Sequence, residues 1–188
     1  SNLLATAGTL ALLGMPWNHV LHQLELMQPV PGRMMRLGGE HGQPVVVVDY
    51  VHTPDALESA LHAVRAHLDG KLVCVFGCGG DRDTGKRPLM GQAAEAGADA
   101  IVITTDNSRS EDPESIAQDI ITGLKDISLA VSIPDREQAI RHCLAHADKS
   151  DIIIVAGKGH EDYQIIGDKK TNYNERAVVA RLQQEYSK

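Results

Sequence analysis

From residue 45 onward, short apolar runs rich in β-branched residues alternate with segments whose apolar residues recur at helical spacing. The runs predict strands at Val45–Asp49, Leu72–Phe76, Ala100–Thr104, Leu129–Ser132 and Ile152–Ala156. Continuous apolar strands separated by helices are typical of a mostly parallel sheet that is covered on both faces. The sequence therefore predicts an α/β domain with a Rossmann-like, mostly parallel sheet.

The intervening helices are marked by the residues that begin them and by apolar stripes. Thr53-Pro54 and Asp112-Pro113 each supply an N-cap residue and a first-turn proline, and Asp135 with Gln138 resembles a capping box. We expect the buried faces to carry Leu57, Ala60, Leu61, Val64 and Leu68, then Ile116, Ile120 and Leu124, then Ile140, Cys143, Leu144 and Ala147. Further elements are expected as an edge strand at Met34–Gly38, a hairpin at Gln164–Lys170 turning at Gly167-Asp168, and a last helix at Glu175–Glu185.

The N-terminal part of the chain follows a different pattern. Apolar residues recur at helical spacing around 3–11 and again around 20–24, with no strand nearby. The stiff, turn-rich segment Pro29–Arg33 predicts a domain boundary. We therefore expect a short helical unit at residues 1–32 and the sheet domain at residues 33–188.

Ligands of such a sheet bind beyond the carboxyl ends of its strands. The loops at these ends are Tyr50–Asp55, Gly77–Pro88, Thr105–Pro113 and Gly157–Gln164. Any binding site of this domain is expected among them.

The stretch F-G-C-G-G-D-R-D-T-G-K-R-P at 76–88 begins like two nucleotide-binding motifs and completes neither. Arg82 stands where a dinucleotide fingerprint needs its third glycine, and Arg87 stands where a phosphate-binding loop needs Ser or Thr. The loop instead presents Arg82 at the edge of the sheet, where a planar guanidinium suits a carboxylate or a phosphate. A solvated arginine in a flexible turn is the structural alternative.

Two other loops add acceptors, an amide and a second arginine. An Asx turn before a capped helix would explain Asp106 and Asn107, but it would not explain the presence of Arg109. After the strand Ile152–Ala156, the glycines at 157 and 159 would let a ligand approach the backbone, and Glu161 could pair with an ammonium. Arginines, an amide and carboxylates at one sheet edge favour a pocket for an amino acid over one for a nucleotide.

Composition and charge exclude several classes of function. A net charge of −7 over 188 residues argues against a general nucleic-acid binder. No apolar run approaches the roughly 20 residues of a membrane span, and the first residues lack the basic region of a secretory signal, so a cytoplasmic protein is expected.

The 3 cysteines include no C-x-x-C pair and are expected to be reduced and buried. His142 and His146 share a helix face but lack a third ligand, so no metal site is predicted.

Taken in order, the loop motifs resemble those of a known family. V-V-D-Y-V-H-T-P-D-A-L at 47–57, the glycine-rich stretch, D-N-S-R at 106–109 and G-K-G-H-E-D-Y-Q at 157–164 are similar to the C-terminal domain of the Mur ligases, above all the members that add meso-diaminopimelate. The similarity extends over nearly the whole chain. Residues 1–32 resemble the end of the family's central ATP-binding domain and its linker.

The resemblance implies an enzyme of peptidoglycan synthesis that uses ATP and Mg²⁺ to attach meso-diaminopimelate to UDP-N-acetylmuramoyl-L-alanyl-D-glutamate through an acyl phosphate. In the family, the P-loop that binds ATP and the domain for the UDP sugar lie upstream of the segment seen here. The resemblance therefore implies no catalytic residue in this chain, no activity of the chain alone, and small-molecule partners bound by a monomer.

Position by position, the resemblance assigns diaminopimelate binding to Arg82, Asp106, Asn107, Ser108, Arg109, Gly157 and Glu161. It assigns contacts with ATP to Arg33, Asp49 and His52. Arg109 would pair with the distal carboxylate, which lysine lacks. The family usually has proline at position 108, and Ser108 keeps neither its fixed φ nor its missing donor, so a looser loop is expected.

Two other functions stay open at this point. A lysine-adding or peptide-recycling relative would share the fold and the ligase chemistry, although Arg109 counts against lysine as the substrate. A free-standing, non-catalytic module that binds an amino acid or a nucleotide would account for the missing catalytic half.

Overall fold

The computed structural model describes residues 2–26, 31–40 and 42–186 of the chain. The chain divides into two compact units, Ser1–Val30 and Pro31–Lys188, each described here by itself. The predicted boundary segment starts at Pro29, and its first two residues lie outside the described part of the chain. None of the described helices is both long enough and apolar enough to span a membrane.

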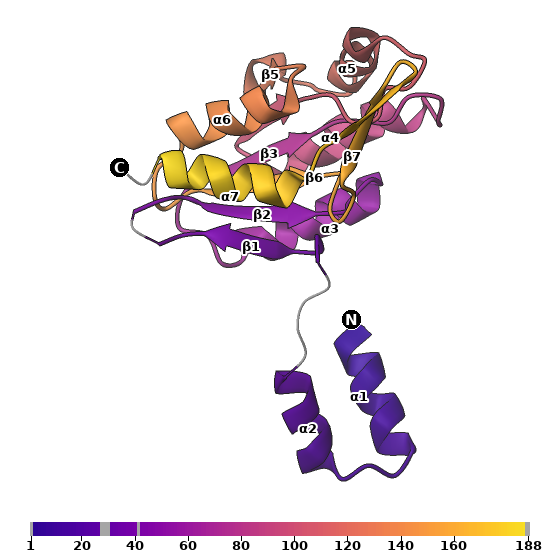
Figure 1. Cartoon of the computed structure of the whole chain (residues 1–188), viewed down its shortest axis with the longest axis vertical. Coiled ribbons are helices and arrows are strands. Elements are labelled where there is room, and N and C mark those ends of the chain that lie inside the picture. The colour runs from indigo at the N-terminus through magenta and orange to yellow at the C-terminus, as the bar shows by residue number, and fades with distance from the viewer. Residues whose placement is uncertain (1, 27–30, 41, 187–188) are drawn as a thin grey trace. The chain divides into compact units, whose positions relative to one another are not determined.

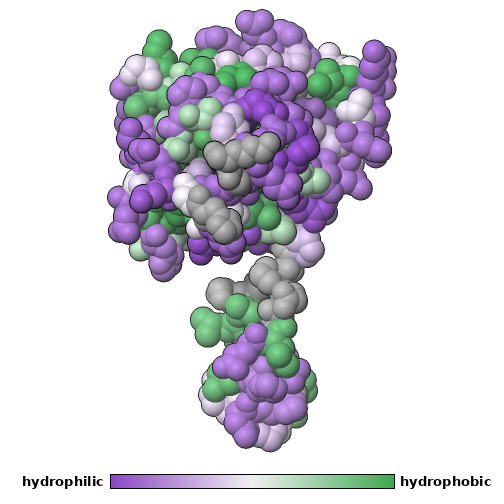
Figure 2. All heavy atoms as spheres, turned by 60° about the vertical axis from the view of Figure 1, so that its left-hand side comes forward, coloured by the Kyte–Doolittle hydropathy of each residue, from purple (hydrophilic) through white to green (hydrophobic). Residues whose placement is uncertain are grey.

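The first unit is a pair of helices, α1 (Asn2–Leu12) and α2 (Trp17–Glu25), as the apolar spacing predicted. Among its described residues, the buried apolar side chains are only Ala7 and Val20. Its exposed large apolar side chains are Leu3, Leu4, Leu12, Leu13, Trp17, Leu21 and Leu26. Figure 2 shows part of this apolar surface in green. A helix pair with so small a core gains little stability from its own packing.

The second unit is built on a 6-stranded sheet with the order β1-β2-β6-β3-β4-β5. Its strands are β1 (Met35–Gly38), β2 (Val45–Asp49), β3 (Leu72–Phe76), β4 (Ala100–Ile103), β5 (Ala130–Ser132) and β6 (Ile152–Ala156). All neighbouring strands run parallel except the edge strand β1, which is antiparallel to β2. The predicted mostly parallel sheet is confirmed, and β6 is inserted between β2 and β3.

Helices cover both faces of this sheet, as predicted (Figure 1). The core on one face joins the sheet to α3 (Pro54–Arg65), α4 (Lys86–Gly97) and α5 (Pro113–Ile121). The core on the other face joins it to α6 (Arg136–His146) and α7 (Glu175–Glu185). Along β6, Ile154 belongs to the first core and its neighbours Ile153 and Val155 belong to the second, because successive side chains of a strand point to opposite faces.

Some element ends differ from the prediction. Strand β5 begins at Ala130, because Leu129 belongs to a short 3-10 turn (Ile127–Leu129) in which the Asp126 carboxylate accepts a hydrogen bond from the Ser128 N–H at 2.9 Å. Strand β4 ends at Ile103, one residue before the predicted end. The local side-chain bond at Asp126 competes with the strand ladder, which apolar periodicity alone does not reveal.

The starts of two helices, α3 and α4, differ in detail from the prediction. Helix α4 begins at Lys86, inside the predicted loop Gly77–Pro88. A proline in the first turn is compatible with a helix, because the N–H groups of that turn have no partner within the helix. Thr53 occupies the N-cap position of α3, but its side chain makes no capping hydrogen bond. The Asp112 and Asp135 side chains do accept the expected capping bonds, from the N–H groups of Ser115 and Gln138.

The cysteines Cys74, Cys78 and Cys143 are free and buried, as predicted. Burial raises the pKa of Cys78 to about 12 and that of Cys143 to about 12. These thiols therefore stay protonated near neutral pH and act as small apolar side chains.

A buried ion pair joins the first residues of α6 and α7. Arg136 Nε donates to Glu175 Oε1 at 2.5 Å, and both side chains are fully buried. Arg136 Nη2 also donates to the carbonyl of Ala156, the last residue of β6, at 2.8 Å. Burial raises the pKa of the Glu175 carboxyl, and the Arg136 guanidinium opposes that rise. The pair thus ties both helices to the end of the central strand.

Removal of Arg136 should expose the cost of a single buried charge. We predict that Arg136→Met lowers the free energy of unfolding by about 3–5 kcal/mol, because Glu175 is left without its cation, and that Glu175→Met in the same protein restores most of the loss. Urea denaturation of the wild type, both single variants and the double variant would measure this. A loss below about 1 kcal/mol for Arg136→Met would contradict the assigned role.

Candidate functional site

Loops that follow β2, β3, β4 and β6 surround a cleft of about 530 Å³ at the carboxyl edge of the sheet. Its lining residues are Tyr50, His52, Gly79, Arg82, Lys86, Asp106, Asn107, Arg109, Gly157, Glu161 and Tyr163. The structure thus brings together all of the predicted diaminopimelate-binding residues except Ser108, and places His52 beside them. The parallel topology explains this, since every one of these loops begins at the same edge.

Arg109 is fixed from two sides. Its backbone has a positive φ of 50°, and it pairs with the hairpin of β7 (Tyr163–Ile166) and β8 (Lys169–Asn172), which was predicted from the turn at Gly167-Asp168. The Arg109 N–H donates to the Ile165 carbonyl at 3.2 Å, and the Gly167 N–H donates to the Arg109 carbonyl at 2.7 Å. The hairpin thereby stabilises a backbone conformation that costs a non-glycine residue energy.

The Arg109 side chain keeps donors available for a ligand. Nη1 donates to the carbonyl of Gly80 at 2.7 Å and to that of Asn107 at 3.3 Å. Nε and Nη2 make no hydrogen bond to any described residue. A guanidinium anchored at one nitrogen and open at the other two is suited to a bidentate carboxylate contact.

Arg82 makes fewer contacts with the protein than Arg109 does. It is exposed, and its Nη1 lies 3.5 Å from the carbonyl of Asp81, at the limit of a hydrogen bond. Asp81 is itself held by the loop of Arg109, since the Ser110 hydroxyl donates to Asp81 Oδ1 at 2.5 Å. The two arginines thus line one cleft from two neighbouring loops.

The glycines of these loops allow neighbouring protein segments to approach closely. A Cβ atom at Gly77 would lie 2.0 Å from the Thr104 carbonyl oxygen, and one at Gly80 would lie 1.9 Å from that of Ser108. Gly157 has a φ of +118°, and its Cβ would lie 2.7 Å from Asp106 Oδ2. The space that these glycines leave is therefore filled by the adjoining loop.

A polar cluster forms the floor of the cleft. Lys158, which is fully buried, donates from Nζ to Asn107 Oδ1 at 2.6 Å and lies 3.0 Å from Asp106 Oδ1 and 3.5 Å from Glu161 Oε2. Asn107 Nδ2 donates to the same Glu161 oxygen at 3.1 Å. Glu161 Oε1 makes no hydrogen bond to a described residue, so it is available as an acceptor for an ammonium.

The charge of Asp106 is maintained by its neighbours. Burial by itself would raise the pKa of this carboxyl, but the Arg136 guanidinium, the Lys158 ammonium and the hydrogen bonds from Lys158 and from the Asn107 N–H outweigh that effect and lower the pKa below its usual range. Asp106 is therefore ionised at neutral pH.

Arg33, Asp49 and His52, the predicted ATP contacts, lie in a smaller hollow of about 110 Å³ next to the cleft. Tyr50 borders both spaces. The Arg33 guanidinium lies over the Tyr50 ring, 5.6 Å from its centroid, and Asp49 Oδ2 accepts a hydrogen bond from the Met34 N–H at 2.8 Å. Asp49 thus contacts the beginning of the second unit and also lines the hollow.

Ser108 stands apart from the other predicted residues. It is fully buried, and it does not line the cleft. Its hydroxyl has no hydrogen-bond partner among the described residues. Its carbonyl accepts from the Glu111 N–H at 3.1 Å, so its backbone serves the turn.

Lys86, Tyr163 and Lys158 take part in the site without having been assigned to it from the sequence. Lys86 and Tyr163 line the cleft, and Lys86 Nζ donates to the His52 carbonyl at 3.1 Å. The available signal was position, since each lies within or beside a loop at the carboxyl edge. Their residue types alone fit a solvated surface equally well.

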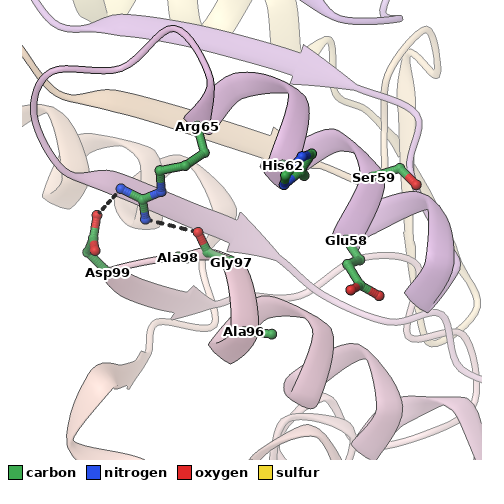
Figure 3. A pocket seen from close by; sticks show the side chains of 8 residues that line it. All are labelled: Glu58, Ser59, His62, Arg65, Ala96, Gly97, Ala98 and Asp99. Atoms are coloured by element: carbon green, nitrogen blue, oxygen red, sulfur yellow. Dashed lines mark hydrogen bonds and ion pairs between the residues drawn. The ribbon is translucent and has the colours of Figure 1, made fainter.

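Another pocket, of about 460 Å³, lies between α3 and α4 and is shown in Figure 3. Its arginine, Arg65, is already engaged, donating to Asp99 Oδ2 at 2.8 Å and to the Gly97 carbonyl at 3.0 Å. It borders the amino end of β4 and not the carboxyl ends of the strands, so the cleft is the better candidate. No group of His, Cys, Asp or Glu side chains in the described part of the chain is arranged to hold a metal.

The unpaired hydroxyl of Ser108 yields a stability prediction. We expect Ser108→Ala to leave the unfolding free energy unchanged or raise it by about 1 kcal/mol, because a buried hydroxyl without a partner carries an uncompensated desolvation cost. Urea denaturation would measure it. Ser110→Ala, which removes a bonded hydroxyl from the same loop, is the control and should not stabilise; a clear loss of stability in Ser108→Ala would contradict the assignment.

The lowered pKa of Asp106 predicts a dependence of stability on acid. Its contribution is present above its unfolded-state pKa of about 3.9 and is lost as the pH falls through the lower folded-state value. At pH 6, Asp106→Asn should therefore be about 1.5–3 kcal/mol less stable than the wild type. The difference should shrink as the pH approaches 2, and a constant difference in urea denaturation across this range would refute the prediction.

Comparison with known proteins relates this cleft to a family. Residues 32–159 match the family described as Mur ligase, glutamate ligase domain. The UDP-N-acetylmuramoyl-L-alanyl-D-glutamate–2,6-diaminopimelate ligase of Ralstonia nicotianae is 52% identical over 182 residues, which are 95% of this chain and 35% of that protein. The chain thus spans about a third of the length of this curated relative.

Solved structures give the same picture. A structure of a UDP-N-acetylmuramoyl-L-alanyl-D-glutamate–2,6-diaminopimelate ligase superposes with a TM-score of 0.79 at 38% identity, covering 100% of this chain and 38% of its own. The UDP-N-acetylmuramate-alanine ligase of Thermotoga maritima has a TM-score of 0.68 at 19% identity, covering 98% of this chain and 36% of its own, and shows the fold alone. Most of the residues that line the cleft lie in the segment that matches the glutamate ligase domain, and the chain belongs to the Mur ligase family.

Proposed function

We propose that this chain is the C-terminal part of an ATP-dependent ligase that adds meso-diaminopimelate to UDP-N-acetylmuramoyl-L-alanyl-D-glutamate in peptidoglycan synthesis. The observation that carries the proposal is the cleft itself, where Arg82 and Arg109 stand beside the Asn107 amide and the Glu161 carboxylate. The relative from Ralstonia nicotianae, whose name states this reaction, supports it.

The donors and acceptors of the cleft suit the carboxylates and an ammonium group of diaminopimelate. This ligand carries carboxylates and ammonium groups at both ends. Arg82 and the open nitrogens of Arg109 would bind carboxylates, and Glu161 Oε1 would accept from an ammonium. Asp106, Asn107 and Gly157 would complete the lining of the binding site. In the full-length ligase, diaminopimelate bound in this cleft would have its amine oriented for attack on the activated carboxylate of the dipeptide.

The adjoining hollow fits one side of a nucleotide. Arg33 supplies a cation for phosphate, Asp49 an acceptor for a sugar hydroxyl, and His52 a flanking ring, all within a space bordered by Tyr50. ATP would supply the phosphoryl group that activates the dipeptide carboxylate as an acyl phosphate. Most contacts with ATP and Mg²⁺ belong in this proposal to the central domain of the full-length ligase.

The first unit supports a place in a larger protein. Its exposed apolar side chains need cover that the helix pair cannot provide. We propose that residues 1–32 are the last helices and the linker of the central ATP-binding domain, that 33–188 form the amino-acid-binding domain, and that the chain alone does not catalyse the reaction. The ligase would act as a cytoplasmic monomer.

Relatives with another substrate remain the second candidate. A murein peptide ligase from Psychrobacter arcticus shares the fold at 17% identity, which supports the architecture and not a substrate. Lysine, the substrate of a lysine-adding enzyme, has no distal carboxylate to pair with Arg109. The free donors of Arg109 therefore favour diaminopimelate. A free-standing binding module would leave the apolar surface of the first unit unexplained.

Arg109 provides the test of the substrate. In the full-length ligase, Arg109→Ala should raise the KM for diaminopimelate roughly ten- to a hundredfold, because it removes a charge-assisted hydrogen bond worth about 1.5–3 kcal/mol. Its discrimination against lysine should fall in parallel. Steady-state kinetics with each amino acid would measure both quantities.

Arg65→Ala is the matched control. Arg65 also donates hydrogen bonds within the protein, but it lies in the pocket between α3 and α4 (Figure 3). It should leave the KM for diaminopimelate unchanged. An unaltered KM and unaltered amino-acid preference in Arg109→Ala would refute the role of Arg109, and turnover of lysine in preference by the wild type would refute the proposed substrate.

A further inference from the structure

Lys158 is a buried cation that contacts the cleft only through other residues. Its side chain is fully buried and is absent from the lining of the cleft. Its Nζ atom reaches Asn107 Oδ1 at 2.6 Å, Asp106 Oδ1 at 3.0 Å and Glu161 Oε2 at 3.5 Å. All of these partners do line the cleft. Burial of an ammonium costs free energy unless the charge is paired. Lys158 is therefore held in place by these three partners and in turn fixes their positions.

The contacts of Asn107 allow only one orientation of its amide. Oδ1 accepts from Lys158 Nζ and from the Ile165 N–H, at 2.9 Å in the second case, and neither group can accept a hydrogen bond. Nδ2 lies on the opposite side, where it donates to Glu161 at 3.1 Å. A flipped amide would place two donors against each other at Lys158 and two acceptors against each other at Glu161. The NH₂ group is therefore held on the Glu161 side.

Lys158 also balances the acidic groups around that amide. Without it, the carboxylates of Asp106 and Glu161 would flank Asn107, and no cation of the described residues would contact both. Repulsion would then favour movement of Glu161 toward solvent. The Tyr163 ring, whose centroid is 5.7 Å from Lys158 Nζ, closes the remaining side of the ammonium.

We propose that Lys158 is a positioning residue for amino-acid recognition. It fixes the Asn107 NH₂ group as a donor next to the Glu161 carboxylate as an acceptor, so that the cleft presents both to the carboxylate and the ammonium of one amino-acid end. The inference rests on the proposed function for the identity of the substrate, and it goes beyond that function in assigning the recognition geometry to a residue that touches no ligand.

Lys158→Met tests this in the full-length ligase. Methionine keeps a similar length without charge or donors. We expect the KM for diaminopimelate to rise roughly tenfold or more, with kcat changed by less than about threefold and the KM for ATP unchanged. Leu182→Ala, a fully buried core truncation on α7, is the stability control and should lower Tm without raising the KM. Equal KM values in Lys158→Met and the wild type would overturn the proposal.

Asn107→Asp provides an independent arm should Lys158→Met fail to fold. The aspartate keeps an oxygen for Lys158 and replaces the NH₂ donor by a second oxygen. We expect a folded protein whose KM for diaminopimelate rises at least tenfold. A KM within twofold of the wild-type value would contradict the orientation that we assign to Asn107.

A crystal structure of the Lys158→Met ligase separates this proposal from the proposed substrate. We expect Asn107 to rotate or Glu161 to leave its wild-type position. Unchanged positions of both side chains would overturn the positioning role whichever amino acid the enzyme uses. Failure of the wild type to use diaminopimelate, with the side chains displaced in the variant, would overturn the substrate alone.

Discussion

The position of β6 between β2 and β3 is the constraint on which the rest of the domain depends. This strand pairs in parallel with both neighbours, so its carboxyl end opens in the middle of the sheet edge. The loop that follows it, with Gly157, Lys158 and Glu161, is therefore surrounded by the loops of β2, β3 and β4. Both apolar cores draw on alternate residues of the same strand. Stability and the assembly of the cleft consequently come from one element.

Buried charge is concentrated where this strand ends. Arg136 binds Glu175 and the last carbonyl of β6, and Lys158 binds the acids and the amide of the cleft floor. Both cations lower the pKa of Asp106 against the effect of burial. Pairs of this kind contribute little net stability compared with apolar packing, but they permit few alternative arrangements. Their value here lies in holding polar side chains in fixed orientations before a ligand arrives.

The candidate cleft lies at the edge of the sheet where the sequence predicts it, but the contacts within its loops follow from the tertiary structure. The loops, Arg82, Arg109 and Glu161 could be predicted because strand periodicity is local and the carboxyl-edge rule then groups the loops. The glycines at 77, 80 and 157 make room for the backbone or side chain of a neighbouring loop, which the sequence pattern did not reveal. Ser108 was predicted to bind the ligand, but it is fully buried and does not line the cleft. Spacing indicates that a small residue is required, not which neighbour requires it.

The sequence by itself determined the fold class, nearly all strand and helix positions and the set of loops that could bind a ligand, because each depends on residues close together along the chain. Only the tertiary structure decided that Lys158 is buried, that it bonds to Asn107, 51 positions away, and that Arg109 is fixed by the hairpin. These contacts follow from the insertion of β6 and from the docking of β7 and β8. The order of strands in a sheet is set by the packing of the whole domain, which local patterns do not encode.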